Sequence, residues 1–192
     1  MSKPCSTLPD PIESKANFVS ALEQIGTEID HQPLRSSALA RIMRETFLGS
    51  DAGGAWDWRK AYDLMQAAAV QALLRGDNSE DDYFAAKLLA SRLLTETRRS
   101  EQQIRLQQFS TPLPFAALAV RAAAIRKGET VLEPSAGTGA LAGFAARAGA
   151  TLSLNEIDPF RHSLLRAVFG GEATGHDGEH IDDLLQTPVL PD

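Results

Sequence analysis

A short apolar run, an acidic residue and a glycine-rich turn follow one another in residues 131–139, Val-Leu-Glu-Pro-Ser-Ala-Gly-Thr-Gly. The residues after them, Ala140 to Arg147, are typical of a helix. A strand, a glycine turn and a helix in this order let the backbone approach a nucleotide-like ligand closely. Gly137 and Gly139 allow positive-φ turns, and their missing side chains are expected to leave room for a cofactor. The stretch predicts the first strand and the ligand loop of a nucleotide-binding sheet.

Strands and helices continue to alternate after this loop. The sequence predicts a helix over 139–148, a strand over Thr151–Asn155, a helix over Pro159–Phe169 and a short strand near Ala173–His176. This alternation favours a parallel sheet with right-handed crossovers. An acid directly after the second strand, here Glu156, usually accepts hydrogen bonds from the two ribose hydroxyls of an adenosine cofactor. The alternative is an acid that caps the next helix, a role for which Asp158 is better placed.

The chain before residue 107 is expected to be helical. Apolar residues recur at helical spacing from Phe18. Two further helices are expected over Ser37–Leu48, ended by Gly49, and over Trp58–Arg75, between Asp57 and Gly76. A capping box at Ser79 and Asp82 opens a fourth helix. After residue 107, a helix is expected over Pro114–Ile125, ended by Gly128. The expected fold is α/β. It has a loose tail over 1–14, a helical subdomain over 15–106 and the first half of a Rossmann-like sheet over 107–192.

Composition narrows the class of protein. The net charge of −6 and the isoelectric point near 5.2 give no globally basic footprint for nucleic acid. Cys5 is the single cysteine, so no internal disulfide forms, and no apolar run reaches the length of a membrane span. No signal peptide is recognised, and a cytoplasmic location is expected. His176 and His180 lie in a glycine-flanked turn without a third clear ligand, so no metal site is expected.

Four segments together resemble consecutive motifs of the adenine-N6 DNA methyltransferases. They are Gln108–Pro112, Leu132–Gly139, Asn155–Asp158 and His176–Asp177. The order is similar to that of enzymes in which a Phe-x-Thr-Pro segment precedes the glycine loop. The chain looks especially like the methylase-like N-terminal part of bacterial methylase/helicase proteins of the strawberry notch type. The resemblance covers most of the chain, best from about Asp57 to Asp183.

The resemblance implies that S-adenosylmethionine is the cofactor. Its methionine end would contact the Thr-Pro segment and the glycine loop, and backbone amides at the helix start would favour its carboxylate. Glu156 would hold the ribose. The adenine would meet Ile157 and Asp177, although Asp177 also fits a simple turn acid. The implied cofactor-binding residues are Thr111, Pro112, Glu133, Pro134, Ala136, Gly137, Gly139, Glu156, Ile157 and Asp177.

The sequence departs from the family at the methyl acceptor. These enzymes carry an Asn/Asp-Pro-Pro-aromatic tetrapeptide after the fourth strand, which grips a base flipped out of the duplex. No Pro-Pro dipeptide occurs in these 192 residues. The expectation is a truncated, cofactor-binding half that is inactive alone, with DNA as a partner through other regions. The Val131 strand would then keep an unpaired edge, which predicts self-association.

Three alternatives stay open from the sequence. An NAD-binding Rossmann enzyme would share the same strand–loop–helix unit, although Gly-x-Gly-x-x-Gly is incomplete because Ala142 stands at its last position. A non-catalytic module beside a helicase would bind cofactor or DNA without chemistry. A structural remnant would bind neither. No residue of the chain is assigned a catalytic role.

Overall fold

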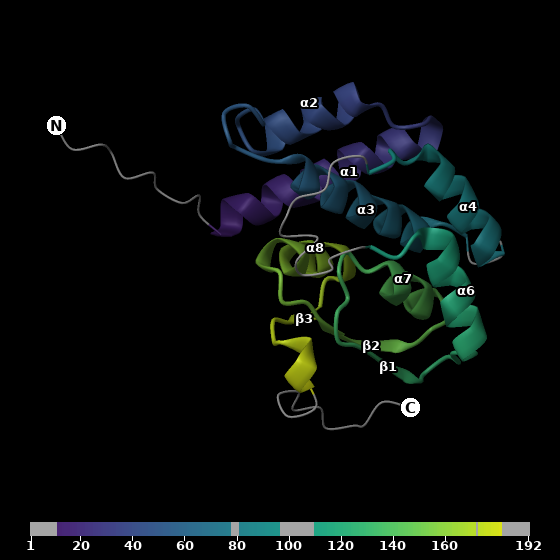
Figure 1. The fold of residues 1–192 in the computed structure, drawn as a ribbon. Coiled ribbons are helices and arrows are strands. Elements are labelled where there is room, and N and C mark those ends of the chain that lie inside the picture. Colours follow the sequence, from purple (N-terminus) through teal and green to yellow (C-terminus); the bar gives the residue numbers. More distant parts are fainter. Residues whose placement is uncertain (1–10, 78–80, 97–109, 172, 182–192) are drawn as a thin grey trace.

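The computed structural model describes residues 11–77, 81–96, 110–171 and 173–181. Over these ranges the protein is α/β, with seven helices and one three-stranded parallel sheet (Figure 1). The helices are α1 (Pro11–His31), α2 (Ser36–Thr46), α3 (Trp58–Arg75), α4 (Asp82–Arg92), α6 (Leu113–Ala123), α7 (Ala140–Arg147) and α8 (Pro159–Phe169). The strands are β1 (Thr130–Glu133), β2 (Thr151–Asn155) and β3 (Ala173–Thr174), followed by the short 3₁₀ turn η1 (Gly178–His180).

The sheet has the order β1-β2-β3, and each crossover is a helix, α7 and then α8. In register, Val131 lies beside Leu152 and Glu133 beside Leu154. Side chains alternate between the faces of a strand, so these four residues share one face. Leu152 and Leu154 pack with residues of α7 and α8, which fixes that face as the helix-covered one. Among the described residues β1 pairs with β2 alone, so its other edge meets no strand.

Helix α3 lies at the centre of the molecule (Figure 1). It contacts α1, α2, α4, α7 and α8, and eleven of its residues are buried. Alanines make up much of this buried surface, and they let neighbouring helices approach closely. A Cβ placed on Gly143 of α7 would stand 2.9 Å from Val70 Cγ1. The α3–α7 approach therefore depends on the missing side chain of Gly143, which leaves room for Val70 and Leu73.

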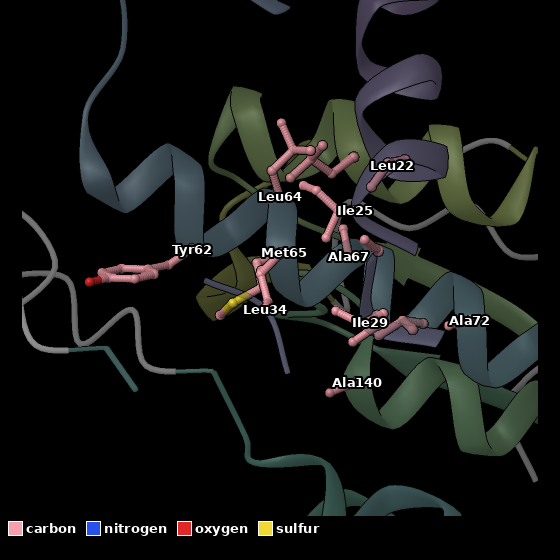
Figure 2. Packing of buried hydrophobic residues seen from close by; sticks show 14 of the residues in the cluster. Leu22, Ile25, Ile29, Leu34, Tyr62, Leu64, Met65, Ala67, Ala72 and Ala140 are labelled. Carbon is pink, nitrogen blue, oxygen red and sulfur yellow. The ribbon is translucent and has the colours of Figure 1, made fainter. Parts of the chain in front are cut away.

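The N-terminal helices and the sheet segment share one hydrophobic core. Leu22, Ile25 and Ile29 of α1 meet Leu64 and other buried residues of α3, as Figure 2 shows. The same cluster continues into the sheet segment through residues of α7 and α8, including Ala140, Phe144 and Leu164. The helices before β1 thus form the second layer over α7 and α8.

Most helix and strand predictions agree with the structure. The bounds of β2, α3 and α8 are those expected, and the Asp57 carboxylate caps α3 by accepting from Lys60 N at 2.8 Å. Asp158 caps α8 by accepting from the N–H groups of Phe160 and Arg161. Agreement is best where a capping side chain and a helical or alternating apolar pattern coincide.

Several helix ends differ from expectation. The left-handed residue after α2 is Leu48, with φ 51°, and not Gly49; the one after α6 is Ala124, also with φ 51°, and not Gly128. Glycine is preferred at such positions but is not required there. Asp81 caps α4 through Tyr83 N at 2.8 Å, while Ser79 lies outside the described residues. Helix α1 begins at Pro11, so the expected tail overlaps its start.

Arg147 joins the sheet segment to the end of α3. Its guanidinium donates to the carbonyls of Leu73 at 2.9 Å, Gly76 at 3.2 Å and Asp77 at 3.0 Å, and to Asp82 Oδ1 at 2.7 Å. The carbonyls at a helix C-terminus lack partners within the helix and attract positive charge. The Arg147 side chain is only 4% exposed, so it satisfies these groups away from water.

Replacing Arg147 with Met tests this contact. The variant keeps much of the side-chain volume but removes the buried guanidinium that donates to three backbone carbonyls and to Asp82, so we expect a loss of about 2–4 kcal/mol in the free energy of unfolding. The matched control is Arg121→Met, whose 73% exposed side chain pairs with Asp81 at 3.6 Å and should matter by less than about 0.5 kcal/mol. Urea denaturation of both variants measures the difference, and equal losses would contradict the assignment.

Candidate functional site

Asn155, the last residue of β2, ties together the segments that follow all three strands. Its Nδ2 donates to the carbonyls of Pro134 and His176, each at 2.9 Å. Its Oδ1 accepts from Thr174 Oγ1 at 2.7 Å and from His176 N at 2.8 Å. A side-chain amide offers two donors and two acceptor lone pairs, and here all four are used. This buried amide fixes the carboxyl edge of the sheet, where ligands bind in open α/β folds.

The Glu156 carboxylate is hydrogen-bonded to the backbone of the glycine loop. Its Oε2 accepts from Gly137 N at 2.8 Å, and its Oε1 accepts from Asp158 N at 2.7 Å. The residue is only 5% exposed. The carboxylate therefore joins the loop after β1 to the turn after β2. A carboxylate has about four acceptor sites, so it keeps capacity for ligand hydroxyls, and its ribose role stays a prediction.

The two loop glycines meet different surroundings. Gly139 has φ 89°, and a Cβ there would stand 2.6 Å from Phe169 Cε2 and 3.1 Å from Leu165 Cδ2. Its missing side chain thus leaves room for α8, and its contact with a cofactor stays a prediction. Gly137 has φ 58°, and a Cβ there would meet only Arg161 Nη1, at 4.0 Å. Of the two glycines, Gly137 is the one with open space.

A small cavity of about 80 Å³ lies under the glycine loop. Two of its lining residues carry buried polar atoms that have no hydrogen-bond partner, Ser110 Oγ and Glu133 Oε2. Burial raises the pKa of Glu133 to about 7; the N–H of Ala142 opposes this rise and the nearby Glu156 adds to it. An unpartnered carboxyl oxygen beside an unpartnered hydroxyl is an arrangement that a ligand with N–H donors would satisfy.

Helix α3 supports this edge of the sheet with three polar side chains. Gln66 Oε1 accepts from Thr138 Oγ1 of the glycine loop at 3.1 Å, and the Gln66 amide donates to Glu96. Asp63 Oδ1 accepts from Arg161 Nε at 2.9 Å and pairs with its Nη2 at 2.8 Å. These contacts fix the glycine loop and the first turn of α8 relative to α3.

The third of these side chains, Arg59, pairs with Asp158, the cap of α8. Burial opposes the ionisation of Asp158. The hydrogen bonds from Arg59 and from the Arg161 backbone nevertheless hold the pKa of this carboxyl below its usual value. The cap is therefore a carboxylate, and its charge is balanced from α3.

The predicted site residues gather at this edge with different exposures. Thr111, Glu133, Ala136 and Gly137 line the 80 Å³ cavity, and Pro112 lines a larger one beside it. The carbonyl of Pro134 accepts from Asn155, and Glu156 lies beneath the loop. Ile157 is 55% exposed, as an apolar surface for a ligand would be. Asp177 is exposed and accepts from Glu179 N at 3.1 Å, the geometry of a turn acid.

The predictions did not include four residues of this edge. Asn155 and Ser110 lay in recognised motifs but received no role. Asp63 and Gln66 lay in a helix that was expected to present its apolar residues to the core. A signal was present in the sequence, because a charged and an amide side chain three residues apart interrupt the apolar face of α3. Such an interruption indicates buried polar partners, but does not identify them.

Comparison of the chain with protein-family models, with curated proteins and with solved structures gives no match. The candidate site therefore rests on its own geometry. Within the described ranges no group of three or more His, Cys, Asp and Glu side chains is arranged to hold a metal ion. Over the same part of the chain, no helix combines the length and apolar character needed to cross a membrane.

A pair of glycine substitutions tests the packing role of Gly139. Gly139→Ala introduces both positive-φ strain and a Cβ against Phe169. Gly128→Ala introduces the same strain at φ 90° with no atom within 4 Å of its Cβ. We expect Gly128→Ala to cost about 1 kcal/mol and Gly139→Ala about 1–2 kcal/mol more. Chemical denaturation measures both, and equal costs would show that α8 does not restrict this position.

The raised pKa of Glu133 predicts a pH-dependent stability. Because the pKa is about 7 in the folded chain and 4.5 in the unfolded one, the folded state holds the proton more tightly. On the order of 3 kcal/mol of stability is therefore present below about pH 4.5 and lost as the pH rises to 7. Glu133→Gln removes this ionisation, so its free energy of unfolding should exceed that of wild type at pH 8.

Urea denaturation at pH 4.5 and pH 8 measures this effect, and the control is Glu23→Gln, which removes an exposed carboxylate on α1. Parallel pH profiles for wild type and Glu133→Gln would refute the buried, unpartnered state of this carboxyl.

Proposed function

We propose that this chain is the S-adenosylmethionine-binding portion of a DNA adenine-N6 methyltransferase-like protein. The observation that carries the proposal is the pair of buried, unpartnered polar atoms under the glycine loop, Glu133 Oε2 and Ser110 Oγ. A carboxyl oxygen desolvated in this way gains most from a ligand that brings a positive charge and N–H donors. The α-ammonium group of an amino-acid cofactor supplies both.

The start of helix α7 supports the binding of the carboxylate of the same amino-acid group. Helix α7 begins directly after Gly139, which has no side chain to cap it, and in its first turn the N–H of Ala142 donates to Glu133. Free N–H groups at a helix N-terminus favour an anion, so the cofactor's carboxylate fits there beside its ammonium group. Glu133 and the start of α7 thus provide complementary charges for a zwitterion. A dinucleotide pyrophosphate would find the same helix start but would meet the Glu133 carboxyl unfavourably.

The remaining roles follow the family resemblance. Thr111 and Pro112 border the methionine side, Glu156 offers its remaining acceptor capacity to the ribose, and the exposed Ile157 gives the adenine an apolar surface. DNA adenine as the acceptor also comes from the motif order and forms part of the proposal.

Calorimetric titration of the full chain with S-adenosylmethionine at pH 8 tests the proposal. We expect saturable binding that Glu133→Gln weakens at least about tenfold, since a charge-assisted hydrogen bond contributes about 1.5–3 kcal/mol. Binding should also weaken as the pH falls below 7, because protonation removes the negative charge of Glu133.

The design separates binding from folding. Glu133→Gln is expected to be more stable than wild type at pH 8, so lost affinity cannot be assigned to unfolding. Glu23→Gln should bind like wild type. Binding of NAD in place of S-adenosylmethionine would contradict the proposal and favour the dinucleotide alternative. Binding of an adenine-containing DNA duplex by a chain that ignores the cofactor would favour the non-catalytic module.

A further inference from the structure

A second, larger cavity of about 430 Å³ opens beside the small one. It lies between α3, the end of α4, the Ser110–Leu113 segment and the start of α7. The two cavities share Ser110, Thr111, Thr138 and Ala140 as lining residues. Its volume falls within the range of about 300–1,000 Å³ that is usual for small-molecule sites. Of the residues given a ligand-binding role above, Ser110, Thr111 and Pro112 border this space.

The lining of the large cavity is mostly apolar. Its apolar side chains come from α3, from α4 and the residues after it, and from the starts of α6 and α7: Met65, Ala69, Val70, Ala90, Leu93, Leu94, Leu113 and Ala140. A compact apolar body placed there would gain about 25 cal/mol for each Å² of surface removed from water. The apolar part of a ligand is therefore bound by ordinary hydrophobic burial.

The polar side of the cavity carries a negative charge, that of Glu96. Glu96 is the only charged side chain among the described residues that line it, and no lysine or arginine is among them. The Gln66 amide donates to Glu96 and so orients its carboxylate. Ser110 Oγ, buried and without a partner, also borders this space. A phosphate or carboxylate ligand would meet repulsion here, whereas an ammonium group would find an acceptor.

We propose that the 430 Å³ cavity binds a small organic cation, in which an ammonium group is attached to a compact apolar body. The ammonium donates to the Glu96 carboxylate, and the body lies against the part-exposed Ala90, Leu93 and Leu94. This ligand binds in addition to that of the small cavity. The site is next to the proposed methyl donor but does not depend on it, because its lining residues supply the whole recognition.

Three probes that share a phenyl ring but differ in charge test this site in the full chain. The probes are 2-phenylethylamine, 2-phenylethanol and phenylacetate, and the signal is the chemical shift of the backbone amides. We expect the amine to bind with a low-millimolar or smaller dissociation constant, and phenylacetate at least about tenfold more weakly. The shifts caused by the amine should centre on Gln66, Leu93 and Leu94. Equal affinities for the amine and phenylacetate, or shifts centred elsewhere, would overturn the proposal.

The variant Glu96→Gln tests whether amine binding needs the negative charge of Glu96. It should weaken amine binding about tenfold and leave 2-phenylethanol binding unchanged, which also reports that the cavity is intact. The matched control, Glu23→Gln, removes the same charge from the exposed side of α1 and should change neither. Unchanged amine affinity in Glu96→Gln would overturn the proposal. If this variant does not fold, the three probes on wild type decide alone.

Titration of the amine in the presence of saturating S-adenosylmethionine tests whether the two ligands bind at separate sites. Amine binding that persists supports two ligands, and competitive displacement would overturn the separate site. If S-adenosylmethionine does not bind at all, the proposed function fails while the three probes still decide the amine site.

Discussion

The buried ion pair between Asp63 of α3 and Arg161 of α8 is the contact on which the arrangement of the site depends. Both side chains are almost fully removed from water, and Asp63 Oδ1 lies 2.9 Å from Arg161 Nε and 2.8 Å from Nη2. Desolvation offsets most of the attraction in such a pair, so its net stabilisation is small. Its effect is positional. The first turn of α8, and with it the turn that contains Glu156, is held in one orientation relative to the central helix.

The same helix also contacts the residues that line the two cavities. Through Gln66 it touches Thr138 of the glycine loop, which lines both cavities, and Glu96, which lines the larger one. Each cavity has one acidic residue, Glu133 or Glu96, and no basic residue among its described lining. The described lining of both cavities therefore favours positive charge. This preference suits the ammonium and sulfonium groups of S-adenosylmethionine, and it disfavours ligands whose recognised part is a phosphate.

Local signals made the strands and most helices predictable. Asp57, Asp158 and the alternating pattern of β2 each act within a few residues, so the bounds of α3, α8 and β2 follow from the sequence. Contacts across long separations were not predictable. The Gln66–Thr138 bond spans 72 positions and the Asp63–Arg161 bond spans 98. Periodicity shows that Asp63 and Gln66 point inward, but only the packing of α3 on α7 and α8 determines what they meet. The role of Gly139 was missed for the same reason.

The residues that follow the strands are held in place by side-chain contacts with α3. Thr138, Asp158 and Arg161 all belong to the segment that begins with β1, yet each has a partner on a helix placed much earlier in the chain. A gene segment that encoded only the glycine loop, β2 and α8 would carry the recognisable motifs into a new protein. It would also separate Arg161 from Asp63, its ion-pair partner on α3. The motifs alone would therefore lack the α3 contacts that position them in this protein.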